Sequence, residues 1–596
     1  MLLDKFMRHQ PGMPALVSKS NPRSRKTFLS PSLVFLLHSG ITNKRLSATI
    51  QKTKQTMPTV PEAIIDRARA EGLSHFFGLP SSGVLLQLLE AGRQQGVDFV
   101  ASVHESSGVI SAGYYGYFKG CAGMSLAIQG VGAGNMFSGA VNVHYERKPA
   151  ICMCECPAIG DFGNWGQQGD HPRMFQATAK ACLRITEENT AQTIHDAFHL
   201  AVQPRPGPVL LELPRNLGSA AANMNLTETV TQKARDPDPA EIDAVCKMVA
   251  SFRKPVIIAG DDVRREGVLD ELKDLADSLQ AAVLLTMDGR GVFPEKDSRF
   301  GCVYIGTAPP HSLYRSFLNE ADGVLVIGAD GRMKESRWDI DVPVCELLIG
   351  DEFPALSDNP RLRVNGRLAP SLRRLIPLRN SQGFSKSRIA ELRASVHARF
   401  ARPQGAHFTA NDIIAITRET LPEDGCLFAE TGIVQSMLEN LWPVTVPNTF
   451  FGSTVGRTMG LTLPALLGAR LACPDRPMVG FTTDGSALMR LGDLEVFART
   501  GAAAPIVIIN DGALGTIRSQ QKFKGLPDYG LEFELIDFSQ IAKTIGLNGV
   551  SVEAPEDFSK VLSVAMTANK TTVIDARVDP EAYQDSFIAT TGMLPQ

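Results

Sequence analysis

Two aspartates that follow apolar runs are the residues of this 596-residue chain best placed to do chemistry. Asp484 follows the run PMVGF and precedes Gly485 and Ser486, and Asp511 follows the run PIVIIN. This strand–turn–helix–strand pattern predicts parallel strands whose carboxyl ends lie side by side, where open α/β sheets bind ligands. Carboxylates there suit Mg²⁺, which commonly bridges them to phosphates. We therefore expect Mg²⁺ at Asp484 and Asp511, and a diphosphate at the backbone N–H groups of Gly485 and Ser486.

The segment 481–516 resembles the thiamine-diphosphate motif of the acetolactate synthase and benzoylformate decarboxylase superfamily. That motif reads Gly-Asp-Gly, followed farther on by Asn-Asn. In this chain Thr483 stands in place of the first glycine, and Asp511 stands in place of the metal-binding asparagine. Asn510 and Asp511 are neighbours on a strand end, so their side chains point to opposite sides and only one of them can reach the metal. The spacing from Asp484 assigns the metal to Asp511 and not to Asn510.

Six further segments stand in the order of the same superfamily. They are FFGLPSSG (76–83), SVHESSG (102–108), LAIQGVGAGN (126–135), RPGPVLLELPRNL (205–217), ETGIVQS (430–436) and GRTMGLTLPALLGA (456–469). The resemblance spans residues 59–579 and implies an α/β protein of three domains with parallel sheets. We expect a pyrimidine-binding domain (58–225), a middle, dinucleotide-binding-like domain (242–378) and a domain that binds diphosphate and Mg²⁺ (400–596).

The resemblance also implies roles for individual residues around bound thiamine diphosphate. Glu105 would hydrogen-bond the pyrimidine N1′ and act in the proton relay. Met459 would wedge between the two rings of the cofactor, and the carbonyl of Ala513 would be the third metal contact. Other cofactor contacts are expected from Gly130, Gly132, Gly432, Val434, Ser436, Gly485 and Ser486.

Residues that recognise the substrate are harder to read. His171 and Gln176, in GDHPRMFQ, lie on a segment that in acetolactate synthases reaches the neighbouring active site. His104 is expected to point away from Glu105 if both lie on a strand. The paired histidines of pyruvate decarboxylases are missing, and Ser519 stands where acetolactate synthases carry a tryptophan.

We therefore predict a thiamine-diphosphate-dependent decarboxylase or carboligase. It would act on a small 2-oxo acid and pass an acyl-anion equivalent to a proton or to an aldehyde, ketone or acyl acceptor. Two alternatives stay open: a 2-hydroxyacyl-CoA lyase, and a catalytically silent regulatory homologue, which Thr483 and Asp511 would favour. We expect no FAD, because GADGR (328–332) replaces the Arg-Phe-Asp-Asp-Arg-like string of acetolactate synthases. In the family each active site is formed by domains of two different subunits, which implies a homodimer or homotetramer.

Composition narrows the remaining classes of function. The chain has 44% hydrophobic and 21% charged residues, as in a globular protein. Its net charge of −3 gives no reason to expect nucleic-acid binding. The apolar run SLVFLLHSG is too short to cross a bilayer, so no membrane partner is expected. Cys152, Cys154 and Cys156 alternate along CMCEC and are expected to be buried thiols in a reducing compartment.

The first 57 residues form a basic leader. Residues 1–56 hold ten Lys or Arg against one acidic residue, Asp4, so they carry +9 and the remainder carries −12. This composition is that of an organellar transit peptide, but it also fits a disordered extension before a first domain that starts at Met57. We expect a cytoplasmic protein, or a mitochondrial one if the leader is a transit peptide.

Overall fold

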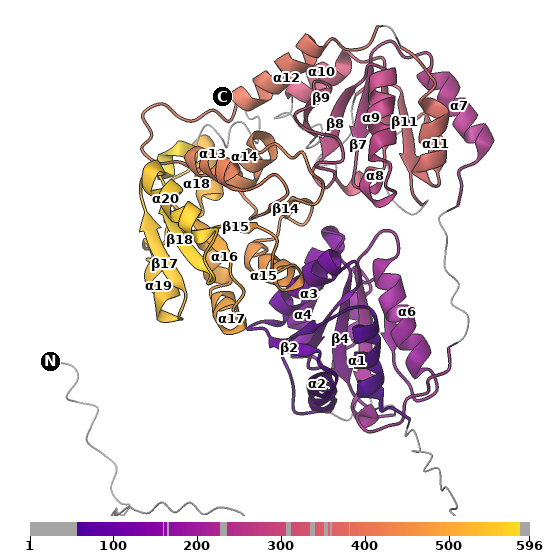
Figure 1. Ribbon diagram of the computed structural model, residues 1–596, viewed down its shortest axis with the longest axis vertical. Helices are drawn as coiled ribbons and strands as arrows, with labels where there is room; N and C mark the ends of the chain where they lie inside the picture. The colour runs from indigo at the N-terminus through magenta and orange to yellow at the C-terminus, as the bar shows by residue number, and fades with distance from the viewer. Residues whose placement is uncertain are drawn as a thin grey trace, which may run out of the picture. The chain divides into compact units, whose positions relative to one another are not determined.

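The computed structural model describes residues 57–583 apart from 159, 162, 164–165, 227–234, 305–311, 334–339, 351–355, 358–359 and 381. The chain divides into a unit Met1–Thr56 and a unit Met57–Gln596. The basic leader before Met57 and the last part of the predicted third domain, 584–596, lie outside the described residues. In the second unit three sheets follow one another along the chain, each covered by helices on both faces (Figure 1).

The first sheet has six parallel strands in the order β2-β1-β3-β4-β6-β5. Its central strands are buried along their whole length, as apolar runs such as AICMCEC and PVLLELP require in a sheet covered on both faces. The strands are β1 (His75–Gly78), β2 (Asp98–Ala101), β3 (Gly123–Ala127), β4 (Ala150–Cys156), β5 (Cys182–Arg184) and β6 (Pro208–Pro214). The helices are α1 (Val60–Ala70), α2 (Val84–Gln95), α3 (Glu105–Lys119), α4 (Val131–Tyr145), α5 (His171–Phe175), α6 (Thr190–Val202) and the 3₁₀ turn η1 (Arg215–Leu217).

The middle sheet has the order β12-β11-β10-β7-β8-β9, which is the doubly wound order of dinucleotide-binding domains. Its strands are β7 (Pro255–Ala259), β8 (Ala282–Thr286), β9 (Phe300–Tyr304), β10 (Gly323–Ile327), β11 (Val344–Leu348) and β12 (Leu362–Asn365). Its helices are α7 (Pro239–Val249), α8 (Asp262–Arg265), α9 (Leu269–Ser278), α10 (Ser312–Asn319), η3 (Gly331–Met333), α11 (Leu368–Leu375) and α12 (Lys386–Ala398). The strand order reverses between β7 and β10.

The third sheet has the order β14-β13-β15-β16-β18-β17, which repeats the topology of the first. Its strands are β13 (Cys426–Ala429), β14 (Phe450–Gly452), β15 (Met478–Thr483), β16 (Pro505–Asn510), β17 (Asn548–Val552) and β18 (Thr572–Arg577). Its helices are α13 (Ala410–Thr420), α14 (Ile433–Leu441), α15 (Thr462–Ala472), α16 (Asp484–Met489), α17 (Asp493–Thr500), α18 (Gly515–Phe523), α19 (Phe538–Thr544), α20 (Pro555–Ala565) and η4 (Pro580–Tyr583). The predicted fold of three parallel α/β domains is confirmed.

The first helix of the first domain and the first helix of the third domain each begin with a capping box. Thr59 accepts from the backbone of Glu62 at the start of α1, and Thr409 does the same with Asp412 at the start of α13. In each case the acidic side chain accepts in return from the backbone of the capping residue, which satisfies two N–H groups that the helix leaves unpaired. The first domain therefore starts two residues after Met57.

Helix α3 joins the first domain to the third. It packs against α15 so closely that a Cβ on Gly468 would lie 2.1 Å from the carbonyl oxygen of Ser111. The Ser111 hydroxyl donates to the carbonyl of Pro464 at 2.8 Å. One hydrophobic cluster accordingly spans both domains, whereas the middle domain has its own. This packing fixes Glu105, the first residue of α3, in relation to the third sheet of the same chain.

Candidate functional site

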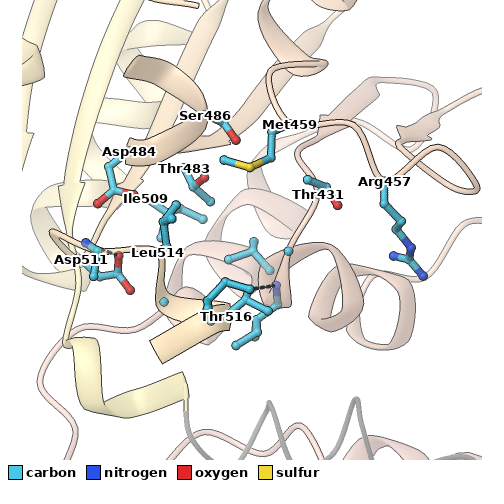
Figure 2. A pocket seen from close by; sticks show the side chains of 16 residues that line it. Thr431, Arg457, Met459, Thr483, Asp484, Ser486, Ile509, Asp511, Leu514 and Thr516 are labelled. Atoms are coloured by element: carbon cyan, nitrogen blue, oxygen red, sulfur yellow. Dashed lines mark hydrogen bonds between the residues drawn. The ribbon is translucent and has the colours of Figure 1, made fainter. Parts of the chain in front are cut away.

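A pocket of about 270 Å³ lies at the carboxyl edge of the third sheet. Its wall is formed by the segments that follow β13, β15 and β16, together with the loop that contains Met459. Strands β13 and β15 are neighbours in the sheet although they are not consecutive along the chain, so the strand order reverses there and the pocket lies at a topological switch point. Such points are where open α/β sheets bind ligands. Figure 2 shows Asp484 and Asp511 together at one side of the pocket and Met459 over its middle.

Backbone N–H groups hold both carboxylates in place. Asp484 accepts from Gly485 at 2.7 Å and from Gly512 at 2.8 Å, and Asp511 accepts from Ala513 at 3.3 Å. Burial raises the pKa of Asp484, and burial together with the adjacent Asp484 charge raises the pKa of Asp511 to about 7. A divalent cation between the two would reverse this effect, because it stabilises the charged form of each. The pair therefore fits a hard cation with oxygen ligands.

Asn510, the neighbour of Asp511, faces away from the pocket. Its amide donates to the Asp575 carboxylate on β18 at 2.9 Å and to the carbonyl of Ile536 at 3.0 Å. Asn510 is buried in these contacts, while Asp511 lines the pocket. The alternation of side chains along β16 thus places the carboxylate, and not the amide, at the candidate metal position.

The remaining wall fits a diphosphate. The Ser486 hydroxyl is buried, lines the pocket and finds no hydrogen-bond partner within the described part of the chain. Gly432 turns the chain from β13 into α14 at a φ of 118°, which L side chains rarely adopt. The backbone therefore approaches the pocket here without a side chain. An unpaired hydroxyl and a bare backbone turn beside two carboxylates match the needs of a metal-bound diphosphate.

The predicted contacts do not all reach this wall. Val434, Met459 and Ala513 line the pocket, as predicted. Ser436 is not among the described lining residues: it is buried in α14, where its carbonyl accepts from Asn440 at 2.8 Å. Its predicted cofactor contact stays a prediction. The Gly485 N–H donates to Asp484 and so orients that carboxylate rather than facing a ligand.

A buried glutamate that the sequence analysis did not assign supports the Met459 loop. Glu430 follows β13 and accepts from the backbone N–H groups of Gly460 at 3.0 Å and Thr462 at 3.3 Å. Burial raises its pKa. These bonds tie the loop after Met459 to the end of β13. An acidic residue directly after the apolar run CLFA was the available sequence signal.

Glu105 begins helix α3 and is not on a strand end, which corrects the sequence expectation. His104 is its N-cap, and the His104 ring accepts from the Ser106 backbone at 3.2 Å. Glu105 is buried, and Asn135 donates to its Oε2 at 3.1 Å. A Cβ on Gly132 would lie 3.2 Å from Oε1 and 2.7 Å from Cγ2 of Ile128, so the position has room only for glycine. Asn135 thus anchors Oε2, and the backbone of Gly132 lies close to Oε1.

His171 supports the turn before α4. Its Nε2 accepts from the Gly130 N–H at 3.0 Å, which leaves Nδ1 to donate to Glu212 at 3.1 Å. Gly130 itself has a φ of 65°, and a Cβ there would lie 2.0 Å from the carbonyl oxygen of Gln167. His171 is fully buried, so its predicted contact with substrate is replaced by a positioning role. Gln176 is exposed at the end of α5, and its substrate role stays a prediction.

Ion pairs occupy the strand ends of the middle sheet. Asp330, after β10, contacts Arg147 at 2.6 Å, Arg332 at 2.8 Å and Arg205 at 3.4 Å. Arg205 also contacts Asp262 at 2.9 Å. These charges keep the pKa of Asp330 below its usual value. The GADGR string therefore builds a buried ionic cluster between the first and middle domains.

The cysteines of β4 are buried thiols. Cys152, Cys154 and Cys156 are fully buried, and burial raises the pKa of Cys156 to about 12. The described ranges contain no group of three His, Cys, Asp or Glu side chains that could hold a metal ion. None of the described helices is both long and apolar enough to cross a membrane.

Three family models match the chain in consecutive order. The N-terminal TPP binding domain of thiamine pyrophosphate enzymes matches residues 58–178, the central domain matches 242–342, and the C-terminal TPP binding domain matches 430–576. Together they cover more than half of the chain and part of each of the three sheets.

Relatives of known name are similar over nearly the whole chain. The acetolactate synthase large subunit of Parasynechococcus marenigrum is 25% identical over 87% of this chain and 87% of its own. The acetolactate synthase of Bacillus subtilis is 23% identical over 90% and 95%. A crystal structure from Mycobacterium smegmatis, described as a "putative thiamin diphosphate-dependent enzyme", superposes with a TM-score of 0.75 at 19% identity, covering 88% of this chain and all of that one.

Proposed function

Because this chain belongs to the thiamine pyrophosphate enzyme family, we propose that it is a decarboxylase or carboligase of 2-oxo acids that uses thiamine diphosphate and Mg²⁺. The observation that carries the proposal is the pocket of the third domain. There two carboxylates and an unpaired hydroxyl face one cavity at the switch point of the sheet. The acetolactate synthases among the relatives support carboligation as the reaction type.

At the metal end, Asp484, Asp511 and the Ala513 carbonyl would hold Mg²⁺, and Ser486 with the backbone around Gly432 would hold the diphosphate. Thiamine diphosphate, when bound, supplies a nucleophilic carbon that adds to a carbonyl and accepts the electrons released as CO₂ leaves. The chain must therefore orient the cofactor, keep its rings bent and move one proton. Met459, fixed through Glu430, would separate the rings.

Glu105 would move the proton. Asn135 holds Oε2, which leaves Oε1 to share a proton with the pyrimidine N1′. A carboxyl group at that nitrogen would favour the imino tautomer, whose exocyclic nitrogen is basic enough to take up a proton. The geometry that supports this role is the burial of Glu105 at the start of α3, with Asn135 holding Oε2.

A second copy of the chain would complete the site. The described pocket wall comes from the third domain alone, so Glu105 is not part of it within one chain. Large apolar side chains are exposed beside both half-sites: Val131 (66%) follows the Gly130 turn, Met489 (60%) ends α16, and Ile517 (43%) lies on the pocket wall. Their burial between two copies would supply the apolar centre of an interface. We propose a homodimer or a dimer of dimers.

We also propose that the enzyme works without a flavin. The ionic cluster around Asp330 uses the ends of β7 and β10, which in this doubly wound order form the crevice for a dinucleotide. Opening that crevice would separate buried charges, which costs several kcal/mol (~3–5) for each broken pair.

The test is CO₂ release from a panel of 2-oxo acids, with and without an aldehyde acceptor, in the presence of thiamine diphosphate and Mg²⁺. Mixing Glu105→Gln with Asp484→Ala chains should then restore activity that neither variant has alone, because one of the two sites in a mixed dimer is intact. If the mixture is as inactive as its components, the shared site is wrong. If the wild type binds cofactor but releases no CO₂ from any 2-oxo acid, the silent homologue that Asp511 favours replaces this proposal.

A further inference from the structure

The loop that contains Met459 is held by a second buried carboxylate, which comes from the first domain. Glu146 is the C-cap of α4 and is buried. Its Oε2 accepts from the Thr454 N–H at 3.2 Å and from the Thr454 hydroxyl at 2.8 Å. Its Oε1 accepts from the Ser453 hydroxyl at 3.3 Å and from the Gly456 N–H at 3.4 Å. Both oxygens of this side chain therefore bind the segment just before Met459.

One of these hydroxyls extends the contact to the residue next to Met459. The Ser453 hydroxyl donates to Glu146 and accepts from the Thr458 N–H at 2.6 Å. On the other side of Met459, Glu430 accepts from the backbone N–H groups that follow it. Met459 therefore lies between two short segments, each of which is fixed by a buried carboxylate.

The backbone between these two segments is strained. Arg457 has a φ of 44°, in the left-handed region that residues with a side chain rarely adopt. Such a conformation persists only where the surrounding structure fixes it. The bond from the Gly456 N–H to Glu146 acts on the residue directly before Arg457. The loop therefore needs its contacts with Glu146 to keep the path that leads to Met459.

Glu146 fits this role as a carboxylate. Its four donors point N–H or O–H groups at it, and an ionised carboxylate is a side chain that only accepts. Burial raises the pKa of Glu146, while the donors of Thr454 and the Lys148 ammonium act in the opposite direction. A glutamine here would turn its NH₂ group toward two of the donors and leave them unpaired.

Resting on the function proposed above, we infer that Glu146 is a positioning residue for Met459. It fixes the loop in the cofactor-free chain, so that the side chain over the middle of the pocket is in place before the rings of the cofactor enter (Figure 2). A side chain that is already ordered loses less freedom on binding, which strengthens binding of the rings. The metal end does not need Glu146, because Asp484 and Asp511 are held by backbone N–H groups of the third domain.

Hydrogen–deuterium exchange of the cofactor-free protein, followed by mass spectrometry, tests the contacts themselves. In Glu146→Gln the amides of 453–458 should exchange at least about tenfold faster, while those of 460–462 keep their rate. Glu430→Gln is the matched variant with the reverse pattern. Thr454→Val removes donors from the loop side and should give a smaller change in 453–458, which serves if Glu146→Gln does not fold. Unchanged exchange of 453–458 in the folded variants overturns the inference.

Binding tests whether these contacts act through Met459. Dissociation constants are measured by calorimetry for thiamine diphosphate and for inorganic pyrophosphate, both with Mg²⁺. Glu146→Gln should weaken thiamine diphosphate at least about tenfold and pyrophosphate by no more than about twofold. Added to Met459→Ala, it should weaken thiamine diphosphate by no more than about twofold further. Asp262→Asn, at a buried carboxylate that pairs with Arg205, is the control and should leave the ratio of the two constants unchanged.

The outcomes separate this inference from the proposed function. If both ligands lose affinity alike in Glu146→Gln, that residue supports the whole pocket and its role for Met459 is overturned. If the wild type binds no thiamine diphosphate, the proposed function fails, and the exchange pattern alone decides whether Glu146 fixes the loop. If the wild type binds cofactor but releases no CO₂ from 2-oxo acids, the function fails while both tests of Glu146 still apply.

Discussion

The candidate metal end of this pocket differs from the family motif by one atom, a carboxylate oxygen in place of an amide nitrogen. Asp511 stands where the family resemblance expects an asparagine, and its carboxylate lies beside that of Asp484 in a buried site. Burial and the repulsion of the adjacent Asp484 charge together raise the pKa of Asp511 to about 7 as long as no cation is bound. The extra charge therefore strengthens the attraction for a divalent cation while it opposes the diphosphate.

Substitution at Asp511 tests this assignment. Asp511→Asn should keep Mg²⁺-dependent cofactor binding, because the amide oxygen still ligates. Asp511→Ala should weaken it by at least about tenfold (~1.4 kcal/mol), since one ligand is lost. Asp484→Ala should be at least as damaging. Thiamine-diphosphate binding, titrated against Mg²⁺ by fluorescence, measures these effects.

Asn510→Ala is the matched control. Its side chain bonds Asp575 inside the sheet, so this variant should lose stability but keep the metal dependence. If Asn510→Ala abolishes Mg²⁺-dependent binding and Asp511→Ala does not, the register of β16 at the metal is wrong by one residue.

Glu105→Gln tests the proton relay. The amide oxygen can still accept from Asn135 and the side chain keeps its size, so cofactor binding should be nearly unchanged. It cannot exchange a proton with N1′, and we expect loss of the C2 proton to slow by about 10²-fold or more. Exchange of that proton with deuterated water, followed by NMR, measures this step without a substrate. An unchanged exchange rate would remove Glu105 from the relay.

At the scale of elements, the junction of α3 with α17 carries a buried acid. Asp493, the first residue of α17, accepts from the Ser107 hydroxyl at 2.8 Å, and Arg490 donates to the Ser106 and Ser107 hydroxyls. Burial raises the pKa of Asp493 to about 6. The neutral acid is therefore the form that this junction between the first and third domains prefers.

This gives the stability a pH dependence with a definite sign. Because the folded pKa lies above the unfolded value of 3.8, the folded chain binds more protons between about pH 4 and 6. As the pH rises through that window, this group should lower the free energy of unfolding by roughly 1–3 kcal/mol. Asp493→Asn should remove that part of the slope in urea unfolding at pH 4 and pH 7, while the exposed Asp270→Asn should not. Parallel slopes in the wild type and Asp493→Asn would contradict the assignment.

At the scale of the whole molecule, the charge is divided unevenly between the leader and the rest. The capping box at Thr59 starts α1 directly after Met57, and Thr59 pairs with Ala221 across the domain. The amino-terminal edge of the first domain is therefore formed by residues that follow the leader. We propose that the protein is cytoplasmic unless the leader acts as a transit peptide.

A chain that begins at Met57 should therefore fold and bind thiamine diphosphate with an affinity within about threefold of the full chain, since none of the proposed cofactor contacts precedes Met57. Circular dichroism, soluble yield and cofactor titration compare the two. A truncated chain that aggregates would show that the leader packs on the body. A fluorescent fusion of residues 1–57 that stays in the cytoplasm would exclude a mitochondrial address.

The sequence by itself determined the fold and the pair of carboxylates at one end of the candidate site. Parallel strands covered on both faces need unbroken apolar runs, and PMVGF and PIVIIN end in the Asp-Gly turns that mark their carboxyl edge. Because both aspartates directly follow strands that pair with each other, their convergence follows from local pattern alone.

The tertiary structure decided what depends on contacts between distant segments. His171 is a support of the Gly130 turn because Glu212, on β6, fixes its tautomer. Glu430 acts on the Met459 loop across the end of β13, and Arg457, in the same loop, contacts Glu439 on α14. None of these pairings has a periodicity or a turn signal, since a side chain's neighbours are set by how elements pack and not by their order in the chain. Packing therefore assigned the supporting residues.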